Sequence, residues 1–411
     1  DLSFLEDLSD LRALKQLTVL WVNFDKAKLH ARLWQQVLPV LRDFVTQGGT
    51  IILDSPPEFA WNDLPVKLNN GKGYAADGRL EITYAYNIAP HHPAMRQLSD
   101  DDFSLWGSDY YLAHRCFEIP QEGNVRPLLV AGTDRAGLTS SPLMELPCGQ
   151  GAWIVSTLEL VNKLAQEPRC AQLLQQIITA AHAPKNKLAK SVGLCVTPDT
   201  LRIMREVGFS GHAAPYQHVL AADVIVIDGQ LLPSDASGIS TALQQGKTVY
   251  LHDLGIEKTR DLLRDLHLPG RAITGVAKAR EYDTIRHTNA LSDGLSNSYL
   301  YWIVNKARVA AWTLAPLHPE PASALIELDG DVPNASPLTR RGAVIIYRLG
   351  VGTLVIDNLQ WQQPNFDEPE RPRRYVRCLL TNLGVPLLKG VDKRMGEEFE
   401  TEAERRERGH F

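Results

Sequence analysis

Histidine and carboxylate side chains lie close together around residues 91–102, where metal or acid–base chemistry would be feasible. His91 and His92 stand before Pro93 in an expected loop, and the acidic run 100–102 follows them. Imidazole and carboxylate groups are common ligands of divalent metals. The alternative is a turn in which an aspartate caps a short helix, and this role needs the same residue types. We therefore assign no metal to this stretch.

Asp54 and Asp253 each end an apolar run that we expect to be a buried strand, and His252 immediately precedes Asp253. The carboxyl ends of parallel strands form the edge at which α/β proteins bind their ligands. One hypothesis is therefore an autonomous hydrolase or amidase whose site lies around His252 and Asp253. A second version of this hypothesis combines Asp54 with His91 and His92. The alternative for both aspartates is capping of the turn that follows each strand.

Trp106 and Trp302 form a matched pair, because each follows a stretch that begins with histidine and ends in Leu-Ser-Asp. Indole rings can stack on sugar rings, so a sugar-binding module is a further hypothesis. This function requires a pocket lined by tryptophan and carboxylate side chains. Large aromatic residues more often fill a core or a domain interface.

The common signatures of nucleophilic, nucleotide and zinc sites are missing from the sequence. No GxSxG elbow, GxxxxGK[ST] loop or HExxH helix occurs, and no GxGxxG follows the expected strand at 192–196. The five cysteines are odd in number and lack CxxC spacing. Cys195 lies inside an expected strand, which indicates packing rather than catalysis. We assign no catalytic residue, no metal and no cofactor.

The elements that must position these side chains alternate between strand and helix. The runs 50–53 and 224–227 are continuously apolar, which is typical of strands buried on both faces. Amphipathic stretches at 29–45 and 239–245 predict helices, and Gly48-Gly49 and Gly246 suit their ends. This alternation predicts an α/β fold with doubly wound, mostly parallel, flavodoxin-like sheets. Paired apolar runs later in each half, at 128–130 with 152–155 and at 324–328, 343–347 and 353–356, predict antiparallel extensions.

An internal repeat organises the chain. The segment from Gly151 (GAWIVSTLEL) matches the segment from Gly352 (GTLVIDNLQW), and a Glu-Pro pair follows each glycine at the same distance. Residues 17–23 resemble 222–228, and residues 41–54 resemble 243–253, in the same order. Such ordered self-similarity indicates a duplication. We predict one domain at 1–184, a second at 191–388 after a polar linker at 183–190, and a charged tail at 389–411.

The two repeats differ at their beginnings. The second opens with an expected strand at 192–196 and a helix at 199–207, whereas the first opens at 2–5 with what we interpret as its second strand. The first strand of a doubly wound sheet is usually central, and its omission would leave unpaired backbone groups on both sides. The hypothesis that follows is an incomplete N-terminus, in which residues before Asp1 supply the missing strand and helix.

Composition narrows the function classes. The 411 residues are 44% hydrophobic and 22% charged, and 43 basic side chains against 48 acidic ones give a net charge of −5. This balance gives no electrostatic case for nucleic-acid binding. No apolar run approaches the roughly 18 residues of a membrane-spanning helix, so we expect no membrane partner. The scattered cysteines favour a reducing compartment, with the cytoplasm as the weakly indicated location.

The order of these motifs resembles a known family. The strand LTVLWVN, the segment QGGTIILD, the stretch HHPAMRQLSDDDFSLW and the strand GQGAWIVSTLEL are similar to class I glutamine-amidotransferase-like domains of bacterial glycoside hydrolases. One such domain supports trimerisation in family 42 β-galactosidases, and tandem copies occur near the C-termini of large family-2-like sugar-processing proteins. The resemblance implies that the amidotransferase triad is missing here, as it generally is in those domains.

The resemblance also implies a function. We expect a non-catalytic accessory, scaffolding or oligomerisation portion of a bacterial carbohydrate-active enzyme. The carboxylate pair that a glycosidase needs would then belong to another domain or chain. The expected partners are that catalytic unit and further copies of this chain. The autonomous hydrolase or amidase and the sugar-binding module remain the alternatives.

Overall fold

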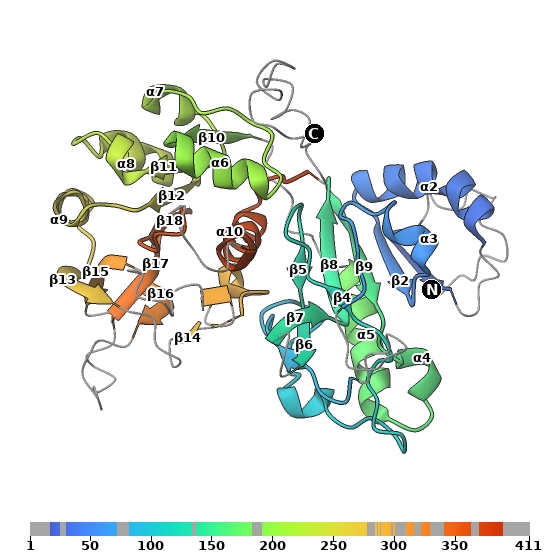
Figure 1. Ribbon diagram of the computed structural model, residues 1–411. Coiled ribbons are helices and arrows are strands. Elements are labelled where there is room, and N and C mark those ends of the chain that lie inside the picture. The colour runs from blue at the N-terminus through green and yellow to red at the C-terminus, as the bar shows by residue number, and fades with distance from the viewer. Residues whose placement is uncertain are drawn as a thin grey trace, which may run out of the picture.

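A computed structural model describes residues 17–24, 30–71, 82–133, 137–182, 191–277, 284–285, 287, 289–296, 299–300, 310–315, 322–328, 341–362 and 370–388. Figure 1 shows an α/β half built from the N-terminal part of the chain beside a second built from the C-terminal part. The expected strand at 2–5, the linker at 183–190, Trp302 and the tail at 389–411 lie outside the described residues.

The first half contains a mixed sheet of order β1-β2-β9-β8-β5, in which β1, β2 and β9 pair in parallel and β8 pairs antiparallel with β9 and β5. Its strands are β1 (Val19–Asn23), β2 (Thr50–Asp54), β9 (Gly151–Ser156), β8 (Leu143–Cys148) and β5 (Arg126–Pro127). A smaller antiparallel sheet contains β3 (Tyr86–Asn87), β6 (Leu129–Thr133), β7 (Gly137–Ser141) and β4 (Phe117–Glu118). The helices are α2 (Ala31–Thr46), α3 (Glu58–Trp61), η1 (Asp100–Phe103), α4 (Leu160–Lys163) and α5 (Pro168–His182).

The second half follows the same plan around a longer sheet of order β10-β11-β12-β18-β17-β15-β13. Its strands are β10 (Val192–Cys195), β11 (Val224–Asp228), β12 (Thr248–His252), β18 (Gly352–Asp357), β17 (Arg341–Leu349), β15 (Ala310–Ala315), β13 (Arg271–Ala277), β16 (Ala322–Leu328) and β14 (Thr284–Ile285). Its helices are α6 (Pro198–Glu206), α7 (Tyr216–Val219), η2 (Gly229–Leu231), α8 (Ser237–Gln244), α9 (Ile256–Asp265), η3 (Ala290–Ser292) and α10 (Glu370–Asn382).

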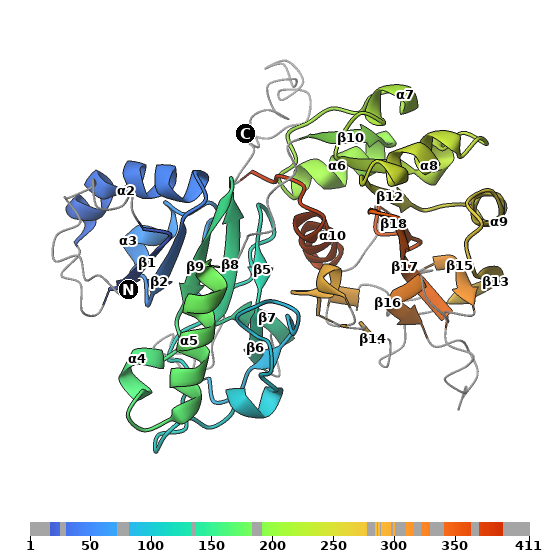
Figure 2. The same cartoon turned by 180° about the vertical axis from the view of Figure 1, so that it is seen from behind.

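Each main sheet is buried on both faces, which confirms the predicted doubly wound α/β class. In β11, Val224 and Val226 pack into the core that contains α6 and α10, whereas Ile225 and Ile227 pack into the core that contains α8 and α9. In β2, Ile52 faces α5, whereas its neighbours in the strand face α2. Successive strand residues point to opposite faces, so a sheet covered by helices on both sides requires continuous apolar runs. Figure 2 shows α5 over one face of the first sheet, in front of β9.

Equivalent glycines bring helix and strand together in both halves. A Cβ atom on Gly151, at the start of β9, would lie 2.0 Å from the carbonyl oxygen of Gly49. A Cβ atom on Gly352, at the start of β18, would lie 2.2 Å from the carbonyl oxygen of Leu243. Strand β9 therefore begins directly against the end of α2 and the turn that follows it, and β18 begins directly against the end of α8.

The structure corrects the alignment of the repeat by one residue. Strand β2 ends at Asp54 and strand β12 ends at His252, and each is followed by a residue in the left-handed region, Ser55 at φ 54° and Asp253 at φ 49°. Asp54 is thus equivalent to His252, and Ser55 is equivalent to Asp253. Both matched segments end in Asp, so the sequence alone aligns Asp54 with Asp253 and not with His252.

Strand order also departs from expectation. β10 pairs with β11 and stands at the end of the described sheet, whereas we expected the first strand to be central. β1 and β2 pair with each other directly in parallel, so no gap separates them in the first sheet. In addition, the antiparallel partner of β9 is β8. The run at 128–130, which we expected to pair with β9, instead contributes to β6 in the smaller sheet. Strand order depends on contacts between distant segments, which an apolar pattern does not encode.

Candidate functional site

The richest polar cluster lies at the carboxyl edge of the second sheet. Parallel pairing places Asp228, the last residue of β11, beside His252, the last residue of β12. The next pair in register is His252 and Asp357, the last residue of β18. All three side chains are buried. The register of three strands therefore produces an Asp–His–Asp row where α/β proteins usually bind ligands.

His252 is fixed through both ring nitrogens. Its Nδ1 lies 3.1 Å from Oδ1 of Asp228, and its Nε2 lies 3.0 Å from the carbonyl oxygen of Leu359. Both partners are acceptors, so both nitrogens donate and the ring is an imidazolium. Burial opposes this charge, but the hydrogen bond to Asp228 and the charges of Asp228, Asp357 and Asp253 together raise the pKa of His252. The indole of Trp361 stacks on the ring with centroids 4.0 Å apart.

The second carboxylate oxygen of Asp228 accepts hydrogen bonds from the N-cap residue of α6. The backbone N–H and the hydroxyl of Thr197 each donate to Oδ2 of Asp228 at 2.7 Å. Thr197 is also the N-cap of α6, where its hydroxyl accepts from the N–H of Thr200. Burial favours the protonated acid, but donors from His252 and Thr197 and the charge of His252 lower the pKa of Asp228.

Asp357 is enclosed by aromatic donors. The hydroxyls of Tyr250 and Tyr375 donate to its Oδ2 at 2.6 and 2.9 Å, and the indole N–H of Trp361 approaches the same atom at 3.3 Å. The N–H of Leu359 donates to Oδ1 at 2.8 Å. Burial raises the pKa of Asp357 despite these donors. The network thus joins three strands to α10 inside the protein.

Asp253 is the more accessible carboxylate at this edge. It is half-buried, its Oδ2 accepts from Nε2 of Gln362 at 2.7 Å, and its backbone N–H donates to the carbonyl oxygen of Asp357 at 2.8 Å. Its backbone lies in the left-handed region, which non-glycine residues seldom adopt but in which asparagine, aspartate and histidine are enriched. This conformation turns the chain away from the sheet.

The corresponding edge of the first sheet has simpler chemistry. Asn23, Asp54 and Ser156 occupy the register positions of Asp228, His252 and Asp357. Nδ2 of Asn23 donates to Oδ2 of Asp54 at 2.7 Å, and Asp54 is buried. No histidine belongs to this row, so the edge lacks the acid–base pair of the second half.

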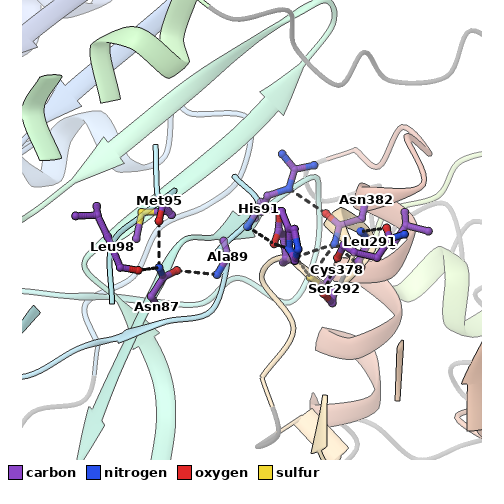
Figure 3. A network of polar contacts seen from close by, with 12 residues as sticks. Asn87, Ala89, His91, Met95, Leu98, Leu291, Ser292, Cys378 and Asn382 are labelled. Atoms are coloured by element: carbon purple, nitrogen blue, oxygen red, sulfur yellow. Dashed lines mark hydrogen bonds and ion pairs between the residues drawn. The ribbon is translucent and has the colours of Figure 1, made fainter. Parts of the chain in front are cut away.

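His91 and His92 take their partners elsewhere. The backbone N–H and the Nδ1 of His91 lie 3.2 and 3.3 Å from Oδ1 of Asp293, which belongs to the second half. Figure 3 shows His91 directed toward Ser292 and Asn382 of that half. His92 is buried, and its Nε2 lies 3.4 Å from Oε1 of Glu145. His91 therefore joins the halves, whereas His92 pairs with a residue of its own half, and none of these contacts involves Asp54.

The acidic run after these histidines behaves as a helix cap. Oδ2 of Asp102 accepts from the backbone N–H and the hydroxyl of Ser99, at 2.7 and 3.0 Å, at the start of η1. This capping box is the alternative that the sequence offered to a metal site. Among the described residues, no group of three or more histidine, cysteine or acidic side chains is arranged to hold a metal.

Trp106 and Trp302 are the tryptophans that a sugar-binding module would use. Trp106 is buried in the core of the first half, and its indole N–H donates to the carbonyl oxygen of Asp102 at 2.8 Å. This placement favours the packing alternative over sugar stacking. Trp302 lies outside the described residues. The cluster residues that sequence reasoning missed are Asp228, Asp357, Tyr250 and Tyr375. The only signal was the repeated Val-Ile-Asp ending of the two strands that carry the aspartates.

The comparisons with known proteins are sparse. No family model matches the chain, and no curated protein matches it. Among solved structures, a cytoplasmic protein from Salmonella typhimurium is similar over 43% of this chain and 75% of its own, at 12% identity and a TM-score of 0.28. A beta-galactosidase from Rahnella sp. R3 is similar over 87% of this chain, at 12% identity and a TM-score of 0.31. The matched region spans 57% of that β-galactosidase. Both likenesses are loose.

Proposed function

We propose that this chain is a non-catalytic accessory portion of a bacterial carbohydrate-active enzyme, which scaffolds or oligomerises a catalytic unit of β-galactosidase type. The observation that carries the proposal is the closed carboxyl edge of the second sheet. A general base must come within hydrogen-bond reach of a substrate proton. His252 has no exposed surface, and both of its nitrogens are engaged within the protein. The cluster therefore acts as a structural core.

The cysteines support the same proposal. A nucleophilic cysteine needs a lowered pKa, so that the thiolate is populated at neutral pH. Burial has the opposite effect here: it raises the pKa of Cys170 to about 12 and that of Cys378 to about 11. It also raises the pKa of Cys116, Cys148 and Cys195. These thiols remain protonated and serve as packing groups.

The enzyme class rests on the family resemblance of the repeated motifs. In that family, comparable domains accompany a catalytic domain that supplies the two carboxylates of glycoside hydrolysis. We propose the same division of labour here, with that catalytic unit and further copies of this chain as the partners.

An exposed aromatic patch supplies a surface for such a scaffold. We define the patch as Tyr84, Tyr86, Leu105 and Tyr110, which are between 38% and 57% exposed. The rings of Tyr84 and Tyr86 meet edge to face at 4.7 Å, and the N–H of Leu105 donates to the carbonyl oxygen of Thr83. Exposed tyrosine is enriched where proteins bind each other. We assign contact between copies of this chain to the patch.

Two measurements test the proposal. The purified chain should hydrolyse none of a panel of nitrophenyl glycosides. Turnover that disappears in Asp253→Asn would contradict the accessory role. In sedimentation velocity, the wild-type chain should self-associate, and a Tyr84→Ser, Leu105→Ser double variant should shift toward the monomer. Val351→Ser is the matched control, because Val351 is 77% exposed outside the patch. An equal response of both variants would contradict the assignment of the patch.

A further inference from the structure

Two arginines of α10 are buried where the halves meet. Arg377 has no exposed surface, and its Nη1 donates to the carbonyl oxygen of Val125 in the first half at 2.8 Å. Arg374 is 5% exposed, and its Nη2 lies 3.5 Å from Oε1 of Glu118, also in the first half. The residues lie three apart on one helix, which places them on the same face. Both guanidinium groups therefore lie at the contact between the halves.

Much of the hydrogen-bonding capacity of these groups is unused. Within the described part of the chain, Nε and Nη2 of Arg377 and Nε of Arg374 are buried without a hydrogen-bond partner. The buried hydroxyl of Tyr299 also lacks a partner among the described residues, and the cations that act on it are Arg377 and Arg374. An unsatisfied buried donor costs on the order of 1–3 kcal/mol, and more when it is charged. So many unpartnered donors in one place need an acceptor.

Charge is also unbalanced at this point. Among the described residues, the only carboxylate within ion-pair distance of the two arginines is that of Glu118, and it contacts Arg374. Arginine does not lose its proton in proteins, so Arg377 cannot become neutral. A buried guanidinium is normally paired with an anion, because an isolated ion is poorly solvated inside a protein. A water molecule would accept hydrogen bonds but would leave this charge in place.

We propose that Arg377, Arg374 and Tyr299 bind a small inorganic anion at the contact between the two halves. Chloride and small oxyanions such as phosphate share the required chemistry, a compact negative charge that accepts several N–H and O–H donors. The planar fork of a guanidinium suits an oxyanion especially well. The bound anion neutralises the Arg377 charge and adds a bridge between α10 and the first half.

Thermal unfolding of the full chain tests the site. Chloride or phosphate is titrated at constant ionic strength, with sodium gluconate as the balancing salt. A tenfold excess over Kd should raise the wild-type Tm by roughly 2 °C or more, with saturation. Arg377→Met should abolish this response. Arg264→Met, which removes an exposed arginine of α9, should keep it. An identical response of wild type and Arg377→Met would overturn the proposal.

A second measurement needs no variant, and it remains decisive if Arg377→Met does not fold. Crystals of the wild-type chain are soaked in bromide, and the anomalous signal locates the ion. A peak within hydrogen-bond distance of the Arg377 guanidinium supports the site. Ordered water in that position, or bromide on surface arginines alone, overturns it.

Discussion

At the scale of single residues, the second half is organised around one buried imidazolium. His252 donates to Asp228 and to the carbonyl oxygen of Leu359, and Asp357 lies beside it in register. The gain from such an ion pair must offset the cost of removing both charges from water. Three donors to Asp228 and four to Asp357 supply the compensation. Removal of the histidine therefore affects more than one contact.

The first prediction concerns the pH dependence of this ion pair. His252 has a raised pKa in the folded protein, so its contribution to stability is complete below its ordinary pKa of about 6.5. The contribution is lost as the pH rises through the higher folded pKa. His252→Gln should cost about 3 kcal/mol below pH 6 and progressively less above pH 7. Urea unfolding of both proteins from pH 5.5 to 9 measures the difference.

Two features make this measurement specific. The carboxylates that act on His252 are Asp228, Asp357 and Asp253, and all three are retained in His252→Gln. His218→Gln, on the exposed surface of α7, is the control and should change stability little at any pH. A cost for His252→Gln that stays constant across the range would show that folding does not raise the pKa of the ring, and a cost that grows with pH would show a ring held neutral in the folded protein.

At the scale of elements, sequence reasoning succeeded where burial alone determines the structure. The apolar runs at 224–227 and 50–53 became β11 and β2, because a strand buried on both faces must be apolar throughout. The amphipathic stretch at 29–45 became α2, which ends before the Gly48-Gly49 pair. These properties belong to short segments, so a local pattern can reveal them.

The candidate site depended on information that no short segment carries. Asp228 and Asp357 each follow an apolar run in the sequence, but their meeting with His252 is set by the register of β11, β12 and β18. The position of β10 at the edge of its sheet is likewise set by pairing between segments that are distant in the sequence. His91 shows the limit most plainly, because its partner Asp293 lies in the other half of the chain.

The second prediction tests the equivalence of the two halves. Gly151→Ala and Gly352→Ala would each place a Cβ atom within 2.2 Å of a backbone carbonyl oxygen. The strand would have to move away from the helix end, at a cost of about 2 kcal/mol or more. Gly255→Ala is the matched control, because its new methyl group would meet no described atom within 4 Å beyond its chain neighbours. This substitution should lower the free energy of unfolding by less than about 1 kcal/mol. Denaturant unfolding compares the three; a large effect at only one of the repeat positions would argue against equivalent packing.

At the scale of the whole molecule, the halves share both apolar and polar contacts. Ile88, Ile119 and Val130 of the first half belong to the same core as α6 and α10 of the second. Nδ2 of Asn124 donates to the carbonyl oxygen of Val385 at 2.9 Å, and the N–H of Leu387 donates back to its Oδ1 at 2.7 Å. Among the described helices, none is both long and apolar enough to cross a membrane. The predicted domain boundaries thus separate two sheets that are joined by a common interior.

The third prediction asks whether the halves unfold together. Arg126 of β5 pairs with the buried Glu145 of β8, and its Nε donates to Oδ1 of Asn382 in α10 at 2.9 Å. Arg126→Met removes both contacts, which should cost about 3–5 kcal/mol because the charge of Glu145 loses its arginine partner. Amide hydrogen exchange should then accelerate in α10 as well as in β8. The matched control is Arg32→Met, on the exposed face of α2, which should leave α10 unchanged.

The double variant Arg126→Met, Glu145→Met separates two causes of this effect. If the unpaired carboxylate causes most of the loss, removal of both charges should recover part of the stability. If the contact with Asn382 matters more, α10 should continue to exchange faster in the double variant, because Asn382 still lacks the Arg126 donor. The same Asn382 side chain donates through Nδ2 to the carbonyl oxygens of Leu291 and Asp293 at 2.9 and 2.7 Å, so its loosening would reach these contacts too. Unchanged exchange in α10 for both variants, with β8 destabilised, would mean that the first half unfolds independently. The shared interior would then be a contact surface rather than a single cooperative core.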